Sequence, residues 1–222
     1  MYSNEMFTQM REFLLNLVFP ERKQEKVVHT LTDTEIFALP KARENNNSRI
    51  PDLVSLFSYK DARVQALIWE LKYHRNSRAL QIVGQLLAEA VMEELSEKAL
   101  FENMSSILLV PIPVTPKRLR ERKFSQTDLI CREMLKHLPA EIVYEPDALK
   151  KIRETEKQSW SKGRAERLKN LRGALQADEK VVSGKTIIII DDVTTTGATL
   201  SEATRALTSA HAKRIFSFTL AH

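Results

Sequence analysis

The stretch between residues 187 and 199, IIIIDDVTTTGAT, constrains the fold of this chain more than any other part of the sequence. Its first four residues are β-branched and apolar, a pattern typical of a strand covered on both faces in a parallel sheet. Asp191 and Asp192 follow directly, so we expect them at the carboxyl end of that strand, where open α/β sheets bind their ligands. The sequence therefore predicts a buried parallel strand that ends in a polar loop.

The polar loop has the composition of a phosphate site. It offers hydroxyl groups and backbone N–H groups where the next helix begins, and the helix dipole strengthens such a cradle. Two adjacent carboxylates repel phosphate, so Asp191 and Asp192 are expected to hold sugar hydroxyls or a hydrated Mg²⁺. An ordinary strand and polar turn would explain the isoleucines but not the residues after them. The predicted contacts to a ribose and its 5-phosphate are Asp191, Asp192, Thr194, Thr195, Thr196, Gly197, Ala198 and Thr199.

Length and composition limit the class of protein. With 222 residues, 43% of them hydrophobic, the chain can bury one core and carry a small appendage. There is no apolar run of the roughly 20 residues that span a bilayer, and the first residues lack a basic region leading into an apolar signal core. We therefore expect a cytoplasmic protein without a membrane span. Cys131 is the only cysteine, which rules out an internal disulfide and predicts a buried residue on a helix face.

Helices and strands alternate after about residue 50, which indicates a doubly wound, mainly parallel sheet flanked by helices. Leu67 and Leu87 fall on the apolar stripes of two predicted helices, and an exposed patch on either would be consistent with a homodimer. Residues 51–222 are expected to form this α/β domain, and residues 1–50 a small appendage with a polar joint. The predicted helices are 61–74, 80–95, 125–138 and 199–210, and the predicted strands are 107–110, 142–144, 187–190 and 215–219.

Positive charge is concentrated in two segments. Residues 117–123 carry a net charge of +4 and residues 150–172 a net charge of +6, whereas the whole chain carries only +5. Such clusters are typical of an anion site for polyphosphate or nucleic acid, although two solvated helical faces would look similar.

The first basic segment follows the predicted strand 107–110 through the turn PIPVTP. Its prolines make the turn rigid, with Ile112-Pro113 a candidate cis bond, and a rigid turn can aim cations at a pyrophosphate. We assign the predicted pyrophosphate contacts to Pro113, Lys117, Arg118 and Arg120.

The second basic segment is polar and joins two strands, which is typical of a mobile lid. A permanently docked helical excursion anchored by Trp160, Leu168 and Leu171 is the alternative, and the two could coexist. Arg153 is expected at the phosphates, and the predicted lid residues are Lys157, Gln158, Lys162 and Arg164.

In this order, the motifs resemble the ComF/GntX-like family of type I phosphoribosyltransferases, the competence protein ComF-like group linked to DNA uptake. The resemblance covers FSYKDARVQALIWELKYHRN, PIPVTPKRLRERKFSQ, KIRETEKQSWSKGRAERLKNLRGAL and GKTIIIIDDVTTTGATL, and it extends to the N-terminal FLLNLVFPER and the final LAH. It implies phosphoribosyl pyrophosphate (PRPP) and Mg²⁺ as ligands, and transfer of the phosphoribosyl group to an acceptor with release of pyrophosphate. It also implies catalytic roles for Asp191, Asp192 and Arg153, with Mg²⁺ held by the two aspartates, in part through water.

Two departures from the family pattern matter. Many relatives carry a four-cysteine zinc ribbon after the LLFP element, but residues 21–49 contain no cysteine. We therefore expect a degenerate, zinc-free remnant. Hypoxanthine-type relatives place an additional acid in the signature loop, where this chain has Thr195, so a 6-oxopurine acceptor is not favoured.

No residue stands out as the base that activates an acceptor, and His74, His137 and His211 are expected on the surface. This keeps a non-catalytic alternative open, in which the protein binds PRPP, a nucleotide or single-stranded DNA within a competence complex beside a partner ATPase. Trp160 and Phe124 would then be stacking surfaces.

The N-terminal segment has its own apolar stripe, which predicts a helix that contacts a partner or a membrane surface, or packs on the protein's own core. The residues of this stripe are Met6, Met10, Phe13, Leu14, Leu17 and Val18.

Overall fold

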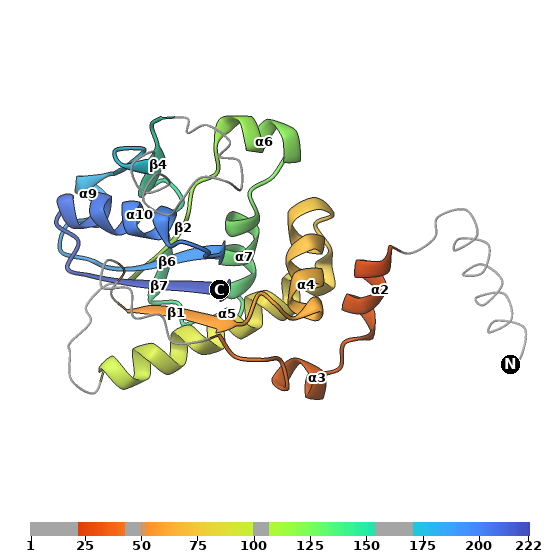
Figure 1. Cartoon of the computed structure of the whole chain (residues 1–222). Helices are drawn as coiled ribbons and strands as arrows, with labels where there is room; N and C mark the ends of the chain where they lie inside the picture. The colour runs from red at the N-terminus through yellow and green to blue at the C-terminus, as the bar shows by residue number, and fades with distance from the viewer. Residues whose placement is uncertain (1–21, 43–49, 51, 100–106, 154–170) are drawn as a thin grey trace, which may run out of the picture.

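A five-stranded parallel sheet forms the centre of the computed structural model, which describes residues 22–42, 50, 52–99, 107–153 and 171–222 (Figure 1). Every pairing within this sheet is parallel, which confirms the predicted α/β fold class. In spatial order, the strands are β1 (Leu53–Phe57), β7 (Arg214–Ala221), β6 (Thr186–Val193), β2 (Ile107–Pro111) and β3 (Ile142–Tyr144).

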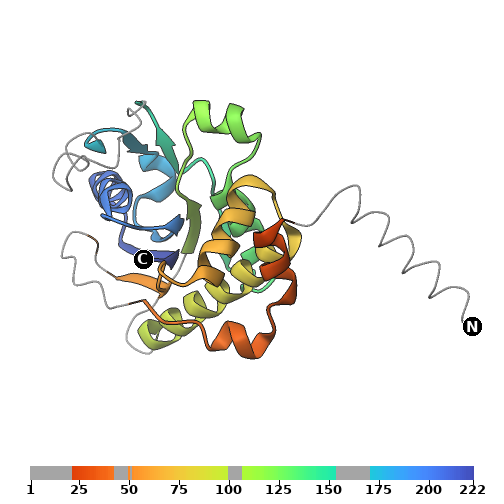
Figure 2. The ribbon, with the colours of Figure 1, turned by 45° about the vertical axis from the view of Figure 1, so that its right-hand side comes forward.

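Helices cover both faces of the sheet, as Figures 1 and 2 show. One face carries α4 (Ala62–Tyr73), α5 (Ser77–Ala99) and α7 (Gln126–Met134), and the other carries α10 (Ala198–Ser209). The isoleucines of β6 explain why. Ile188 and Ile190 enter the core of the first face, Ile187 and Ile189 enter that of the second, and all four are fully buried. Each such side chain contributes about 1.5–3 kcal/mol when it leaves water, so β6 is the natural centre of the fold.

A smaller, two-stranded antiparallel sheet lies on the α10 side. It pairs β4 (Leu149–Lys151) with β5 (Leu175–Ala177), packs against α10, and is followed by α9 (Glu179–Val182). These two strands were not predicted from the sequence. Each strand has only three residues, and a long segment that includes residues 154–170 separates them in the sequence. No local sequence pattern therefore predicts that they pair.

The described part of the N-terminal region packs on the domain. It contains α2 (Lys23–Thr30) and α3 (Asp33–Phe37), whose buried side chains join the same core as α4 and α5. Arg22 forms an ion pair with the fully buried Glu70 of α4 at 3.0 Å. Arg78 of α5 donates to the carbonyl oxygens of Val28 and Leu31, and so caps the end of α2. These bonds fix α2 against α4 and α5 (Figure 2).

Two local predictions were wrong. The helix that begins after Ser125 ends at Met134 instead of residue 138, because residues 135–138 turn away towards β3. The Ile112-Pro113 bond is trans, as are all peptide bonds of the described residues. The Ile112 N–H donates to the carbonyl of Ile190, so the pairing with β6 continues one residue beyond β2. The Ile112 carbonyl accepts from the Thr127 hydroxyl.

The packing of α5 on α7 gives a testable prediction. A Cβ atom on Gly84 would lie 2.5 Å from Cγ and 2.7 Å from Cβ of the buried Glu133 side chain. We expect Gly84→Val to lower the free energy of unfolding by about 1–3 kcal/mol, because an overpacked interface must shift. Urea denaturation measures the loss. Gln81→Val, at an exposed position of the same helix, is the control for introducing valine into α5, and equal losses in the two variants would contradict the close contact.

Candidate functional site

The predicted acidic pair lies at the carboxyl end of the central strand, within the last three residues of β6. The carboxylates are held close to the backbone: Asp191 Oδ1 accepts from the Asp192 N–H at 2.9 Å, and Asp192 Oδ1 accepts from the Val193 N–H at 2.7 Å. The following Thr194 N–H donates to the carbonyl of Ala221 at 3.0 Å. The polar loop therefore starts from a fixed point between β6 and β7.

The loop leads directly into a helix, as predicted. Gly197 is the N-cap of α10 at φ +71°, a left-handed conformation that glycine adopts without steric cost. No side chain caps this end of α10, and the first helical bond runs from the Ser201 N–H to the Gly197 carbonyl. The first N–H groups of α10 and their dipole therefore remain available for an anion. Thr194 is buried, Thr195 is exposed, and Thr196 and Thr199 are half-buried, so the loop also presents hydroxyl groups.

Lys72 of α4 joins this site, although the sequence analysis did not select it. Its Nζ lies 3.0 Å from Asp192 Oδ2. Burial, followed by the charge of Asp192, raises the pKa of Asp191 to about 8, against the opposing effect of Lys72. Donors or cations brought by a ligand would favour the ionised form of Asp191. Lys72 precedes Asp192 by more than a hundred residues, so only the folding of the chain brings the two side chains together.

His222 is a second residue that the sequence analysis missed. Its Nδ1 lies 3.1 Å from the carbonyl oxygen of Thr194, and because a carbonyl only accepts, Nδ1 must carry the proton. The His222 backbone pairs with Phe57 and Tyr59 at the end of β1. His222 thus links β1 to the start of the polar loop. The predicted strand stopped at residue 219, whereas β7 continues to Ala221, and this extension places His222 beside the loop.

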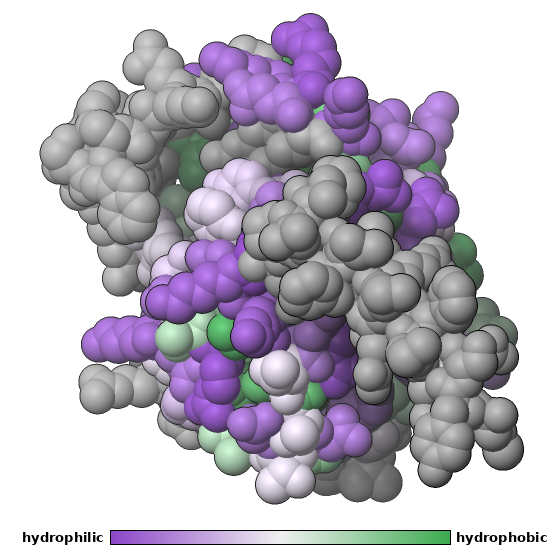
Figure 3. Space-filling model, turned by 90° about the vertical axis from the view of Figure 1, so that its right-hand side faces the viewer, coloured by the Kyte–Doolittle hydropathy of each residue, from purple (hydrophilic) through white to green (hydrophobic). Residues whose placement is uncertain are grey.

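The predicted pyrophosphate residues follow the neighbouring strand. Pro113 lies in the turn after β2, and that turn starts beside β6 through the bond from Ile112 to Ile190. Lys117, Arg118 and Arg120 are in α6 (Pro116–Arg122), where Lys117 and Arg120 are exposed. Hydrophilic side chains crowd the top of the face shown in Figure 3, the end of the molecule where Figure 1 places α6.

Arg153 lies at the base of the β4–β5 pair. Its guanidinium donates to the carbonyl of Arg172 at 2.9 Å, and the adjacent Ile152 N–H donates to the carbonyl of Ala174. The structure thus places Arg153 on the small sheet, where its predicted catalytic role stays a prediction. The lid residues Lys157, Gln158, Lys162 and Arg164 lie outside the described residues, as does Trp160. His74, His137 and His211 are exposed, as expected.

Glu202 of α10 connects the small sheet to the helix that starts at the polar loop. Its carboxylate is 5% exposed and accepts from the Gly173 N–H at 2.7 Å and from Arg205 at 2.7 and 2.8 Å. Gly173 has φ +73°, so it makes the turn into β5 without strain. The base of the segment that contains Arg153 is therefore tied to α10.

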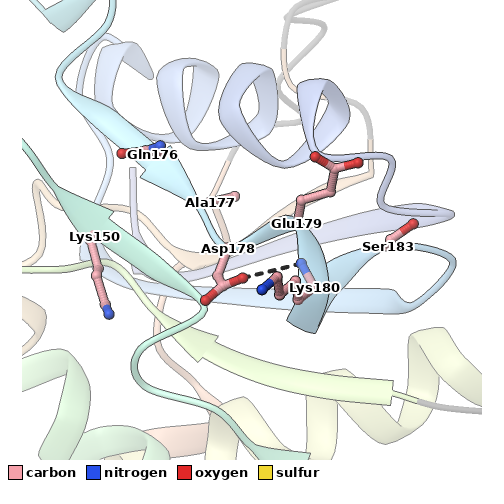
Figure 4. Close-up of a pocket in the computed structure, with 7 residues that line it drawn as sticks. All are labelled: Lys150, Gln176, Ala177, Asp178, Glu179, Lys180 and Ser183. Carbon is pink, nitrogen blue, oxygen red and sulfur yellow. Dashed lines mark hydrogen bonds between the residues drawn. The ribbon is translucent and has the colours of Figure 1, made fainter.

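A hollow of about 800 Å³ lies elsewhere, beside β4, β5 and α9 (Figure 4). Asp178 there accepts a hydrogen bond from the Lys180 N–H and so begins α9. None of its lining residues is a predicted site residue: they are Lys150, Gln176, Ala177, Asp178, Glu179, Lys180 and Ser183.

The described residues hold no group of three or more His, Cys, Asp or Glu side chains that could bind a metal. They also include no helix long and apolar enough to cross a membrane. Cys131 is buried on α7, and burial raises the pKa of its thiol well above the usual value, which leaves the thiol unreactive.

The chain is similar to known proteins over part of its length. Residues 131–222, which include β6 and the polar loop, match the phosphoribosyl transferase domain. The chain is 30% identical over 141 residues to DNA utilization protein YhgH of Escherichia coli K12, covering 64% of this chain and 59% of that protein. It is 36% identical over 114 residues to competence protein ComFC of Bacillus subtilis strain 168, covering 51% and 43%. The chain thus matches less than two thirds of the length of either relative.

Among solved structures, a hypoxanthine phosphoribosyltransferase from Staphylococcus aureus matches with a TM-score of 0.38 and 12% identity, over 63% of this chain and 61% of that one. The matched domain and the named relatives confirm the resemblance found in the sequence.

Proposed function

We propose that this chain, which is related to the ComF-like phosphoribosyltransferases, binds PRPP at the carboxyl end of β6. It would transfer the phosphoribosyl group of PRPP to an acceptor and release pyrophosphate. The observation that carries this proposal is the junction of β6 with α10. Two carboxylates end the strand, and an uncapped helix N-terminus begins after the four residues 194–197. One short segment thus offers acceptors for ribose hydroxyls and donors for the 5-phosphate.

The binding roles follow from charge. The 5-phosphate is expected at the N-terminus of α10, with hydroxyl donors from Thr195, Thr196 and Thr199. The ribose hydroxyls are expected to donate to Asp191 and Asp192, since charge-assisted hydrogen bonds to carboxylates are among the strongest available. We expect the anomeric carbon and its pyrophosphate to face the turn after β2, because that turn starts beside β6.

Several cations are expected around the pyrophosphate. Lys117, Arg118 and Arg120 of α6 follow the turn at Pro113, and Arg153 would approach from the small sheet. Two adjacent carboxylates suit Mg²⁺, which keeps several waters and binds through one or two carboxylates and the substrate's phosphates. Mg²⁺ held by Asp191 and Asp192 would neutralise charge on the leaving pyrophosphate.

The reaction breaks the bond between the anomeric carbon and a pyrophosphate oxygen, and the electron pair leaves with the pyrophosphate. Positive charge then develops on the ribose ring, as in other glycosyl transfers. Asp191 and Asp192 would stabilise that charge from the hydroxyl side, while the cations of α6 hold the leaving group. Groups that are held in place before the reaction starts stabilise developing charge effectively, because they need no reorganisation during the reaction.

Calorimetric titration of PRPP into the folded protein, with and without Mg²⁺, tests the proposal. Saturable binding that depends on Mg²⁺ is expected, followed by a screen of acceptors for pyrophosphate release. No heat of binding from a protein that is folded by circular dichroism would overturn the PRPP site. Binding without pyrophosphate release from any acceptor would leave binding as the function.

His222 gives a further prediction for this site. His222→Ala is expected to weaken PRPP binding about fivefold, since one hydrogen bond contributes about 1 kcal/mol. His222→Asn should retain most of the affinity, because the Asn amide N–H can replace Nδ1–H at the Thr194 carbonyl. His137→Ala, at an exposed position, is the control in the same titration. Equal affinity for His222→Ala and wild type would contradict a role in positioning the loop.

A non-catalytic role in DNA uptake is the alternative, favoured by the names of the two relatives. The described surface offers one feature for it: Arg75 lies over the Phe124 ring at 5.3 Å, next in sequence to the cations of α6. Aromatic and cationic groups together suit single-stranded DNA. Salt-dependent binding of single-stranded DNA that PRPP displaces would favour this alternative, as would capture of a competence ATPase. Either function would be carried out in the cytoplasm.

A further inference from the structure

Two large aromatic side chains are exposed together on α4. Trp69 and Tyr73 are 45% and 50% exposed, and their ring centroids are 4.5 Å apart. They lie one helical turn from each other on the side of α4 that faces away from the core, whereas Leu67, Ile68 and Leu71 are buried. Adjacent exposed aromatic side chains are typical of a surface that another element covers.

The N-terminal part of the chain joins the fold beside this pair. Arg22 is the first described residue, and its guanidinium lies 3.0 Å from the carboxylate of Glu70. Glu70 is fully buried, and it precedes Tyr73 by three positions, so these two residues are neighbours along α4. Residues 1–21 therefore reach the described structure at the border of the aromatic pair.

Those 21 residues carry an apolar surface of matching character. Their apolar positions recur with the spacing of one helix face, and the face is rich in Met and Phe, which contact aromatic rings favourably. The members of this face are Met6, Met10, Phe13, Leu14, Leu17 and Val18.

We infer that the apolar face of residues 6–18 docks on Trp69 and Tyr73 of the same molecule. Because Arg22 is held at α4 by Glu70, this contact is intramolecular. Its entropic cost is therefore lower than the cost of binding a second molecule at the same surface. The docked segment covers the side of α4 that also carries Lys72, and so stands next to the Lys72–Asp192 pair. This inference concerns the N-terminal segment and does not depend on PRPP binding.

Fluorescence of Trp69 tests the inference. The chain has two tryptophans, so Trp160→Phe leaves Trp69 as the only reporter in the full-length protein. In that background, Leu17→Asp places a charge in the apolar face and is expected to release the segment. Acrylamide quenching of Trp69 should then increase by roughly twofold, with a red-shifted emission, since a half-exposed indole loses its cover. Unchanged quenching would overturn the inference.

Two controls make the result specific. Asn16→Asp adds the same charge on another side of the predicted helix and should leave the quenching unchanged. Circular dichroism and urea denaturation show whether Leu17→Asp keeps the domain folded.

Cross-linking identifies the occupant independently of the fluorescence. A Leu17→Cys, Tyr73→Cys variant should form a link within one chain when treated with a short bismaleimide, while the buried Cys131 stays unmodified. Asn16→Cys with Tyr73→Cys is the matched control and should link less. Links found only between two chains, which would assign the surface to a second copy, or no link at all, would overturn the inference.

Discussion

Replacing Asp191 and Asp192 together by asparagine is expected to lower the affinity for PRPP by at least about a hundredfold. A hydrogen bond to a charged group contributes about 1.5–3 kcal/mol, and the variant loses two such acceptors. Calorimetric titration with Mg²⁺ present measures the loss. An Asp147→Asn, Glu141→Gln variant removes the same charge from exposed positions and should bind as wild type does. Unaltered affinity in the Asp191 and Asp192 variant would contradict the assignment of the ribose site.

In the ligand-free protein, Asp191 should lower the free energy of unfolding at neutral pH. The pKa of Asp191 in the fold is about 8, above its value in the unfolded chain, so the folded state holds the proton more tightly. The stability that this proton provides is full below about pH 4 and is lost as the pH rises towards 8. Asp191→Asn cannot ionise, so its advantage over wild type should grow between pH 5 and pH 8.

Thermal melts of wild type and Asp191→Asn at both pH values measure this difference, which we expect to reach about 1–2 kcal/mol. A constant difference across this range would contradict the raised pKa. A site that lowers the stability of the ligand-free protein and favours binding of the ligand is typical of functional positions.

The parts of the fold that local pattern determines were predicted from the sequence. The four isoleucines of β6 indicate a strand buried on both faces, because alternate side chains point to opposite sides of a sheet. Ser125 was predicted to begin a helix, and its hydroxyl accepts from the Asp128 N–H. Such signals are contained within a few residues of the chain.

Features that depend on the packing of distant segments were not predicted. Lys72 of α4 reaches Asp192 of β6 only in the folded chain, and His222 reaches Thr194 only through the register of β7 with β6. The apolar stripes containing Leu67 and Leu87 were predicted, and both residues are buried in the core, whereas the exposed aromatic side chains of α4 are Trp69 and Tyr73. Periodicity identifies which face of a helix is apolar but not what covers it.

The largest expected effect on stability is at the connection between the small sheet and α10. Burial alone would raise the pKa of Glu202, but the hydrogen bonds from Arg205 and the Gly173 N–H lower it below its ordinary value. The folded protein therefore favours the ionised carboxylate. This contribution is present above the ordinary glutamate pKa of about 4.3 and is lost as the pH falls through the lowered value.

Arg205→Leu is expected to lower the free energy of unfolding by about 3 kcal/mol at pH 7, because it leaves the buried carboxylate of Glu202 without its cation. The value is at the low end for buried pairs because Arg205 is partly exposed and water can replace it. Urea denaturation measures the loss, which should shrink below pH 4 as Glu202 takes up a proton.

Adding Glu202→Gln to Arg205→Leu removes the unpaired charge and should restore most of the stability. This double variant separates the electrostatic connection from simple loss of packing, since lost packing would leave it as unstable as Arg205→Leu. Because Glu202 also holds the Gly173 N–H, at the base of the segment that carries Arg153, the single variant should weaken PRPP binding even where the protein is folded. Full affinity in folded Arg205→Leu would show that the small sheet does not position groups at the PRPP site.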